Sequence, residues 1–334
     1  MAKHHGKYGM NNSTFFKNKK VIVTGSSGLL GSWLVEDLIS NNAEVTGICI
    51  DDSKDDLLKT KGLLNEIKTY YLNIGNFNEL EKVFSSKNFD IVFHLAAQTQ
   101  VTKALKNPLE TLKSNVQGTW NVLELCRKFN LPIVSASSDK SYGVSDNLPY
   151  LETHPLNGEF PYEVSKSSSD LISTMYKTTY GLNVVSLRCG NIFGGGDFNW
   201  DRLIPGTIKT LLEESTPILR TKGDFVREWV YVKDVSNAYL EVAKAIFHKK
   251  NNYSAYNYSS GESKTVREIY EKISQIIHGS VVEPIIELDS KFEIKNQTLD
   301  SNLIKKDLGV INKYEFDESL NETVQWYKNY LSSH

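Results

Sequence analysis

The chain has 334 residues, 40% of them hydrophobic, so it is long enough to bury one large core or two smaller ones. Its 38 basic and 40 acidic residues nearly cancel, which argues against a nucleic-acid or membrane-surface partner. No apolar run reaches the length of a membrane span, and no signal peptide is visible. The three cysteines, Cys49, Cys126 and Cys189, lie far apart and lack metal-ligand spacing. We therefore expect a cytoplasmic protein with neither a disulfide framework nor a bound metal.

The N-terminal part of the chain contains a dinucleotide-binding pattern. Residues 1–17 lack an apolar core and are predicted to form a mobile leader. A β-branched strand at 21–23 then leads into a turn with Gly25, Gly28 and Gly31, followed by a helix with one apolar stripe. Such a turn lets the backbone approach a pyrophosphate, and the helix N-terminus offers it free N–H groups. The residues of this turn predicted to contact the cofactor are Gly25, Ser27, Gly28, Leu29, Leu30 and Gly31.

A second strand, at 44–50, ends at Asp51, twenty residues after Gly31. A carboxylate there can accept hydrogen bonds from both hydroxyls of the adenosine ribose, and it repels the 2′-phosphate of NADP. We therefore predict NAD as the cofactor. The alternative is a tight strand–helix turn followed by a solvated aspartate.

Strands and helices continue to alternate up to residue 190. Because such repetition produces a parallel sheet covered on both faces, the predicted fold is α/β, with a Rossmann-type doubly wound sheet. The expected strands are 69–72, 90–95, 132–136 and 183–188, and the expected helices are 76–84, 109–129 and 162–180.

Beyond residue 190 the elements become shorter and more mixed. An irregular polar stretch runs over 194–202. Its glycines at 194–196 follow a strand end, which favours a loop that closes over a substrate, and the alternative is a merely flexible loop. We expect 18–190 to form the NAD-binding domain with the catalytic residues. Residues 191–334 should form mainly a smaller, mixed substrate-binding lobe, interleaved with the last strands of the first domain. Its expected elements are 204–213, 217–219, 235–247, 266–277, 281–286 and 318–330.

Two clusters carry side chains suited to catalysis. Ser138, Asp139 and Lys140 follow the fifth strand, and Tyr162 and Lys166 share one helix face at i and i+4. Tyrosine, with a pKa near ~10, is a poor base at neutral pH. A lysine ammonium and a nicotinamide cation nearby would favour its phenolate, and a serine could bind the same substrate hydroxyl. The combination suits removal of a proton from an alcohol while NAD takes a hydride. A tyrosine and a lysine at this spacing are also common on ordinary helices, so the upstream glycine turn is what favours catalysis.

On these motifs the chain resembles the extended short-chain dehydrogenase/reductases that act on nucleotide sugars, over roughly residues 20–330. Further matches are His94-Leu95-Ala96-Ala97, Asn115-x-x-Gly118-Thr119 and Arg188-Cys189-Gly190-Asn191. The resemblance implies that Ser138, Tyr162 and Lys166 form the catalytic triplet. It also implies a homodimer paired through helices 109–129 and 162–180. Additional cofactor contacts implied by it are Asn73, Ile74, Leu95, Ala96 and Ala97.

The same resemblance implies a nucleotide-diphosphate sugar as the substrate. Asn115 would hold the active-site helix or the substrate, and Arg227 would lie near the diphosphate, which a guanidinium binds well. Arg202 and Arg220 are either phosphate ligands or surface charges. The full set of expected substrate contacts is Gln98, Asn115, Asn191, Arg202, Leu203, Arg220 and Arg227.

Within this family, Ser138-Asp139-Lys140 and the stretch 190–205 are most similar to CDP-glucose 4,6-dehydratases. A dehydratase oxidises C4, removes the C5 proton and expels the C6 hydroxyl, which leaves well only when an acid such as Asp139 protonates it. Lys140 stands where dTDP-glucose enzymes carry a glutamate base. It can be a base only if desolvation or a cation lowers its pKa, and otherwise it stabilises an enolate or a phosphate.

The predicted activity is therefore formation of a 4-keto-6-deoxy sugar nucleotide by internal hydride transfer through bound NAD. The sequence of residues 227–231, Arg-Glu-Trp-Val-Tyr, departs from the CDP-glucose pattern and leaves the nucleobase open. An NAD-dependent epimerase or C4 dehydrogenase is the nearer alternative, and a non-catalytic dinucleotide-sensing protein is the remote one. His94, at the end of an apolar strand, is expected to be structural.

Overall fold

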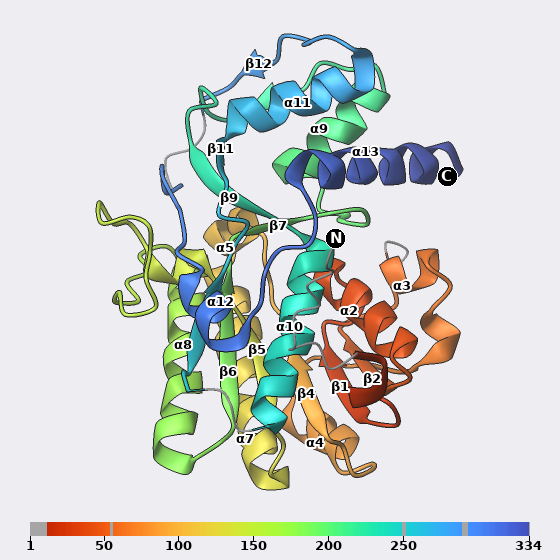
Figure 1. Ribbon diagram of the computed structural model, residues 1–334, viewed down its shortest axis with the longest axis vertical. Coiled ribbons are helices and arrows are strands. Elements are labelled where there is room, and N and C mark those ends of the chain that lie inside the picture. The colour runs from red at the N-terminus through yellow and green to blue at the C-terminus, as the bar shows by residue number, and fades with distance from the viewer. Residues whose placement is uncertain (1–11, 54–55, 249–251, 289–292, 334) are drawn as a thin grey trace, which may run out of the picture.

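A parallel sheet of seven strands forms the centre of the computed structural model, which describes residues 12–53, 56–248, 252–288 and 293–333 (Figure 1). The strand order is β10-β6-β5-β4-β1-β2-β3, and every pairing within it is parallel. This confirms the predicted Rossmann-like α/β fold. The strands are β1 (Lys20–Thr24), β2 (Glu44–Cys49), β3 (Lys68–Tyr71), β4 (Ile91–His94), β5 (Ile133–Ser138), β6 (Val184–Cys189) and β10 (Ala255–Tyr258).

Both faces of the sheet are covered by helices, which explains why the strands are apolar runs rather than alternating sequences. In β1, Val21 and Val23 pack into the core on one face, and Ile22 packs into the core on the other. On the first face lie α2 (Leu29–Ser40), α10 (Val232–Phe247) and α12 (Asn302–Leu308). On the second lie α4 (Phe77–Phe84), α7 (Gly118–Phe129) and α8 (Pro161–Tyr180).

The chain order reverses between β1 and β4, because β2 and β3 extend the sheet in one direction and β5 and β6 in the other. The carboxyl ends of the strands at such a switch point diverge, leaving a crevice for a ligand. Helix α5 (Val101–Lys106) and η3 (Asp139–Tyr142) contribute residues to this crevice. Two other short elements of this part of the chain are α3 (Leu57–Thr60) and η1 (Leu64–Glu66).

A smaller lobe lies above the sheet in the view of Figure 1. Its three-stranded sheet has the order β11-β9-β7, and a separate pair joins β8 with β12. Three helices pack around an aromatic-rich core that includes Phe193, Trp229 and Tyr327. The elements are β7 (Asn191–Phe193), α9 (Leu203–Leu212), β8 (Ile218–Leu219), β9 (Val226–Tyr231), β11 (Ser263–Thr265), α11 (Val266–His278), β12 (Ile285–Ile286) and α13 (Phe316–Ser333).

Several observed elements were not expected from the sequence, among them β7, β9 and β11 of the smaller lobe and α12. Two further differences concern the central sheet and the helix expected at 109–129. The short strand β10, which pairs with β6, was not among the expected strands, since its four residues include a buried Asn257 and carry no apolar run. The expected helix 109–129 is interrupted: α6 (Pro108–Leu112) is followed by a π-helical turn, η2 (Lys113–Gln117), before α7. In that turn the backbone oxygen of Asn115 accepts the hydroxyl of Ser169 at 2.8 Å, a contact that ties the turn to α8.

The start of the chain also needs a correction. Residues 1–11 of the expected leader lie outside the described residues, but 12–15 form helix α1 (Asn12–Phe15) and Phe16 is fully buried in the core. The packed chain therefore begins before residue 17. Within the described ranges, no helix is long and apolar enough to cross a membrane. Cys49, Cys126 and Cys189 are free and buried.

Candidate active site

A cavity of about 1560 Å³ opens between the carboxyl ends of the strands and the smaller lobe. Pockets for a single small ligand are commonly roughly 300–1,000 Å³. The cavity therefore has room for a dinucleotide and a second ligand beside it.

The glycine turn forms the cofactor side of this cavity. Gly25 has a φ of +71°, and a Cβ atom on it would lie 2.8 Å from the backbone of Ala96. A Cβ atom on Gly31 would lie 2.0 Å from the carbonyl oxygen of Gly25. Helix α2 begins after Gly28, where no side chain caps the helix N-terminus. The bare backbone and uncapped N–H groups fit the pyrophosphate of a dinucleotide.

Nearly all of the predicted cofactor residues line the cavity. The exception is Asp51, whose side chain is exposed and lies outside the cavity wall. Strand β2 ends at Cys49, two residues earlier than Asp51, and Ile50 takes part in the wall instead. A bond from Asp51 to the ribose stays a prediction. The lining residues of this set are Gly25, Ser27, Gly28, Leu29, Leu30, Gly31, Asn73, Ile74, Leu95, Ala96, Ala97, Tyr162 and Lys166.

His94 lies at the end of β4 and links the two strands of the switch point to a neighbouring helix through hydrogen bonds. Its Nδ1 lies 2.8 Å from the hydroxyl of Thr24, and its Nε2 lies 3.0 Å from the hydroxyl of Thr119. Complete burial lowers the pKa of His94 to about 3, so the imidazole is neutral. This confirms the expected structural role, because the ring joins β1, β4 and α7.

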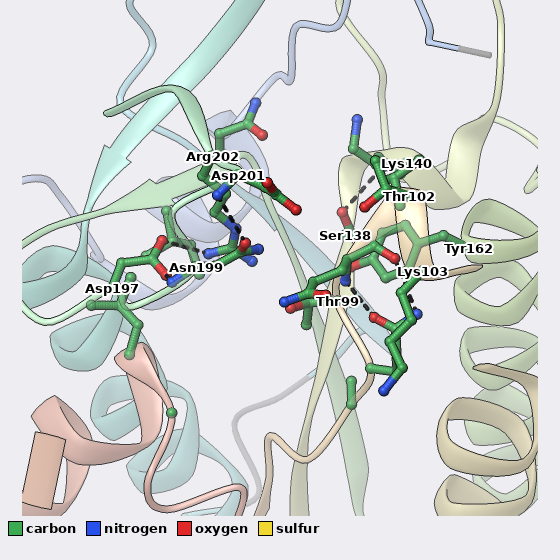
Figure 2. A pocket seen from close by; sticks show the side chains of 18 of the residues that line it. Thr99, Thr102, Lys103, Ser138, Lys140, Tyr162, Asp197, Asn199, Asp201 and Arg202 are labelled. Carbon is green, nitrogen blue, oxygen red and sulfur yellow. Dashed lines mark hydrogen bonds and ion pairs between the residues drawn. The ribbon is translucent and has the colours of Figure 1, made fainter. Parts of the chain in front are cut away.

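The last residue of β5 and the two residues after it form a polar cluster at the site, and Figure 2 shows Ser138 and Lys140 there. The hydroxyl of Ser138 donates to Oδ1 of Asp139 at 2.9 Å and accepts from the backbone N–H of Lys140 at 3.3 Å. Asp139 is 2% exposed, and its Oδ2 has no hydrogen-bond partner. A buried carboxyl oxygen without a partner is costly unless a ligand group meets it. Asp139 is thus oriented by Ser138, and its second carboxyl oxygen is buried without a donor.

Tyr162 and Lys166 reach the cavity from the first turns of α8. Burial raises the pKa of Tyr162 to about 12, while the positive charge of Arg202 and a hydrogen bond with Ser138 act in the opposite direction. The ammonium of Lys166 donates to the backbone oxygen of Ala136 at 3.2 Å, and burial lowers its pKa to about 8. The influence of Arg202 on Tyr162 is additional to the two roles expected for Arg202, a phosphate ligand or a surface charge.

Arginines occupy the opposite wall. Figure 2 shows Arg202 and Asp201 facing Ser138, Tyr162 and Lys140 across the cavity. Arg202 pairs with Asp197 at 2.9 Å, and Arg220 pairs with Asp201 at 3.5 Å. These pairs hold both guanidinium groups at the cavity, where phosphate oxygens can meet them. The expected substrate residues that line it are Gln98, Asn191, Arg202, Leu203, Arg220 and Arg227.

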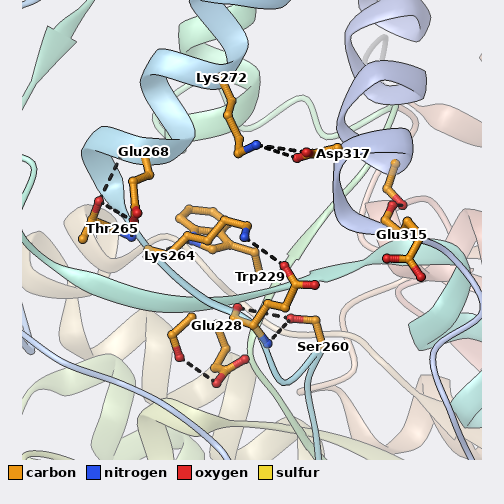
Figure 3. A network of polar contacts seen from close by, with 12 residues as sticks. Glu228, Trp229, Ser260, Lys264, Thr265, Glu268, Lys272, Glu315 and Asp317 are labelled. Carbon is orange, nitrogen blue, oxygen red and sulfur yellow. Dashed lines mark hydrogen bonds and ion pairs between the residues drawn. The ribbon is translucent and has the colours of Figure 1, made fainter.

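Arg227 lies on β9, next to the network of polar contacts around Glu228 that Figure 3 shows. Its guanidinium donates to the backbone oxygens of Val226 and Lys295, each at 2.9 Å. In the next residue, a carboxylate oxygen of Glu228 accepts the hydroxyl of Ser263 on β11 at 3.0 Å. A salt bridge of 2.8 Å between Lys272 and Asp317 then joins α11 to α13. The strand that carries Arg227 is therefore fixed within the lobe.

Asn115 does not line the cavity. Its amide nitrogen donates to the backbone oxygen of Gln98 and to the hydroxyl of Ser165, both at 2.9 Å, and its amide oxygen accepts the N–H of Gln98 at 2.7 Å. All of its polar atoms are used inside the protein. Of the two roles expected for Asn115, holding the active-site helix fits the structure, and direct contact with a substrate does not.

Sequence reasoning overlooked several residues at the site. Thr102 and Lys103, on α5, line the cavity, and so does Asp197. Thr102 and Lys103 follow β4 by several residues, whereas a parallel sheet predicts ligand contacts at the positions immediately after each strand. Within the described residues, no group of three or more histidine, cysteine or acidic side chains can hold a metal ion.

The chain matches the model of the NAD dependent epimerase/dehydratase family over residues 21–257. It belongs to this family. The cofactor of the protein is accordingly NAD, and the family's members are sugar-nucleotide dehydratases and epimerases.

Individual relatives fall on both sides of that division. The chain is 28% identical to the CDP-glucose 4,6-dehydratase of Salmonella typhimurium, over 96% of this chain and 94% of the relative. It is 32% identical to a putative UDP-glucose 4-epimerase of Methanocaldococcus jannaschii, over 92% of this chain and 98% of the relative. A crystal structure of the dTDP-glucose 4,6-dehydratase of Streptomyces venezuelae, with NAD and TYD bound, superposes with a TM-score of 0.83. It is 26% identical and covers 94% of this chain and 98% of that chain.

Proposed function

We propose that the protein is a nucleotide-sugar 4,6-dehydratase, similar to those acting on CDP-glucose, that forms a 4-keto-6-deoxy sugar nucleotide. The observation that carries the proposal is Asp139. Its buried carboxyl is held by Ser138 at 2.9 Å, its other oxygen is unpartnered, and it lines the same cavity as Tyr162. Loss of the C6 hydroxyl requires an acid at this place, whereas epimerisation at C4 does not.

Ser138 links the two proton-transfer groups of the proposed reaction. Tyr162 takes the proton of the C4 hydroxyl, and NAD supplies the acceptor for the C4 hydride, which returns to C6 later in the turnover. The hydroxyl of Ser138 donates to Asp139, and Ser138 lies close enough to Tyr162 to affect the tyrosine pKa, so that the protonated tyrosine can donate to the Ser138 oxygen. A proton collected by Tyr162 can therefore pass through Ser138 to Asp139, which delivers it to the departing C6 hydroxyl. The C4 hydroxyl proton thus leaves in the water molecule, and the protein ends the cycle unchanged.

Lys140 is the proposed base for the C5 proton. It lines the cavity beside Asp139, and burial lowers its pKa from the usual value for a lysine. A neutral amine takes the C5 proton as the C6 hydroxyl leaves, and the resulting ammonium returns it to C5 when the hydride reaches C6. Tyr162, Lys166 and Ser138 act at C4 in this scheme, and Asp139 and Lys140 act at C5 and C6.

The arginines of the opposite wall are proposed to bind the diphosphate of the substrate. Arg202, Arg220 and Arg227 all line the cavity. Asn191 and Leu203 would contact the sugar nucleotide beside them. The similarity to the Salmonella CDP-glucose enzyme supports CDP-glucose as the first substrate to test. In this scheme 18–190 remains the NAD-binding domain and 191–334 mainly the substrate-binding lobe.

A homodimer in the cytoplasm is also proposed. Large apolar side chains are exposed on α6, α7 and α8, including Leu109 at 60%, Trp120 at 44% and Leu171 at 56%. A surface with several such residues is typical of a protein–protein contact. Sedimentation of wild type and Leu171→Glu tests this, because the charged variant should sediment as a monomer. The three free, buried cysteines are consistent with a reducing compartment.

Mass spectrometry of the enzyme incubated separately with CDP-, dTDP-, UDP- and GDP-glucose tests the proposed reaction. We expect one substrate to lose a single water without net consumption of added NAD. The similarity to the putative UDP-glucose 4-epimerase favours epimerisation as the second candidate. A change of configuration without water loss would establish that alternative, and net NADH release would indicate a C4 dehydrogenase. A non-catalytic, dinucleotide-sensing protein would convert none of the sugars.

A further inference from the structure

Gln297 contacts Lys140 from the far end of the chain. The Nζ of Lys140 lies 2.8 Å from Oε1 of Gln297, although 157 residues separate the two in the sequence. Gln297 is completely buried, and it lies behind Lys140 rather than in the cavity wall. Its Nε2 has no hydrogen-bond partner. The contact with Lys140 is therefore the hydrogen bond that its buried amide makes.

The backbone around Gln297 is held on both sides. Its N–H donates to the backbone oxygen of Val226 at 3.1 Å, at the start of the strand that carries Arg227. The next residue, Thr298, accepts the N–H of Tyr150 at 2.8 Å, and the N–H of Asp300 donates to the oxygen of Tyr150 at 3.0 Å. A side chain on such a segment has a defined position, so it can fix the end of a long and flexible lysine.

We propose that Gln297 is a positioning residue for Lys140, holding the amine at C5 through an uncharged acceptor. The proposal rests on the proposed function, in which Lys140 is the base. An amide oxygen accepts one N–H of Lys140 in either protonation state and leaves the lone pair of the neutral amine free for the substrate. A carboxylate in the same place would stabilise the ammonium and remove the base.

Other charges around Lys140 come from several elements and partly cancel. Asp139, Glu163 and Glu293 favour the ammonium, and Arg227 disfavours it. Burial is the largest influence and lowers the pKa of Lys140. A carboxylate at position 297 would lie at hydrogen-bond distance from the Nζ of Lys140, so it would favour the ammonium and raise the pKa of Lys140.

The test uses Gln297→Glu and Gln297→Leu, with Gln275→Glu as the matched control on the exposed face of α11. The pH dependence of acetylation of Lys140 by trace acetic anhydride, followed by peptide mass spectrometry, reports its protonation without any turnover. In Gln297→Glu we expect the midpoint to rise by at least about one pH unit, which is a tenfold change in the fraction of neutral amine. The control should leave it in place.

Turnover provides the second measurement. In Gln297→Glu the acidic limb of the kcat profile should move to higher pH by the same amount, with KM within about twofold. In Gln297→Leu kcat should fall at least tenfold without an upward shift of that limb. An unchanged Lys140 midpoint in folded Gln297→Glu, or unchanged kcat in Gln297→Leu, would overturn the proposal. If the wild type dehydrates no sugar nucleotide, the proposed function fails, while the acetylation midpoints still decide whether Gln297 sets the protonation of Lys140.

Discussion

The glycine turn on the cofactor side of the cavity is formed by backbone from one short stretch of sequence, whereas the arginine wall on the substrate side is formed by side chains of several elements of the smaller lobe. On the cofactor side, Gly25 and Gly31 touch each other and the chain after β4 so closely that no Cβ fits. On the substrate side, Arg202, Arg220 and Arg227 come from separate elements and depend on ion pairs and backbone acceptors for their positions. A backbone site tolerates few changes, while a side-chain site can change its ligand by single substitutions.

Tyr162 joins the two sides, and its substitution should have the largest effect. Because phenylalanine keeps the ring and removes the proton acceptor, Tyr162→Phe should lower turnover about a thousandfold, within the range of general acid–base catalysis. NAD affinity and the melting temperature should stay near wild type. Product formation by mass spectrometry is the measurement, and Tyr180→Phe at the exposed end of α8 is the control. Retention of turnover in Tyr162→Phe would remove this residue from the mechanism.

Gly31→Ala should weaken NAD binding by distorting the glycine turn. The added methyl would lie 2.0 Å from the carbonyl oxygen of Gly25, so the turn must shift. Overpacking of this kind costs about 3 kcal/mol, and we expect NAD affinity to fall about a hundredfold together with the melting temperature. Calorimetric titration with NAD measures the affinity. In Gly62→Ala a Cβ meets no atom within 4 Å but the φ of +70° strains the backbone, so the melting temperature should fall while NAD affinity is unchanged. An equal loss of NAD affinity in both variants would contradict the steric explanation.

Arg202→Gln should weaken substrate binding without affecting NAD binding. Losing a charge-assisted hydrogen bond to a phosphate costs about 1.5–3 kcal/mol, so KM should rise roughly tenfold or more while NAD affinity is retained. The positive charge of Arg202 also lowers the pKa of Tyr162. The alkaline shift of the pH profile for kcat in the variant measures this second effect. A loss of NAD affinity in Arg202→Gln would show that the two sides are not separable.

The smallest predicted effect concerns the pH dependence of folding stability, to which the buried His94 contributes. Its folded pKa of about 3 lies below the value of roughly 6.5 expected in the unfolded chain, so the unfolded state binds the additional proton. The contribution of His94 to the free energy of unfolding is therefore fully present above the pKa of the unfolded histidine, and it is lost as the pH falls below that value toward the folded pKa. When the pH is lowered from 7.5 to 6, proton linkage predicts that the free energy of unfolding falls by about 0.8 kcal/mol. Urea unfolding at both pH values measures it, and His94→Gln should lack this contribution.

Much of the cofactor side was predictable because its determinants are local. The glycine spacing, the apolar run of β1 and the stripe of α2 all lie within about twenty residues, and each reflects steric or periodic constraints that act over short range. The placement of Ser138 and Tyr162 in one cavity was also predictable, because both follow the carboxyl edge of a parallel sheet. Asp51 is the local prediction that the structure did not place in the wall, since β2 ends at Cys49.

By itself, then, the sequence determined the α/β fold, the glycine turn for NAD and the residues that follow β5. Only the tertiary structure decided that Asn115 is consumed by Gln98 and Ser165, that Arg202 acts on Tyr162, and that Gln297 holds Lys140. The physical reason is the distance along the chain. The contact between Lys140 and Gln297, which are 157 residues apart, forms only when the smaller lobe has packed on the sheet. It therefore cannot be predicted from local periodicity or turn residues.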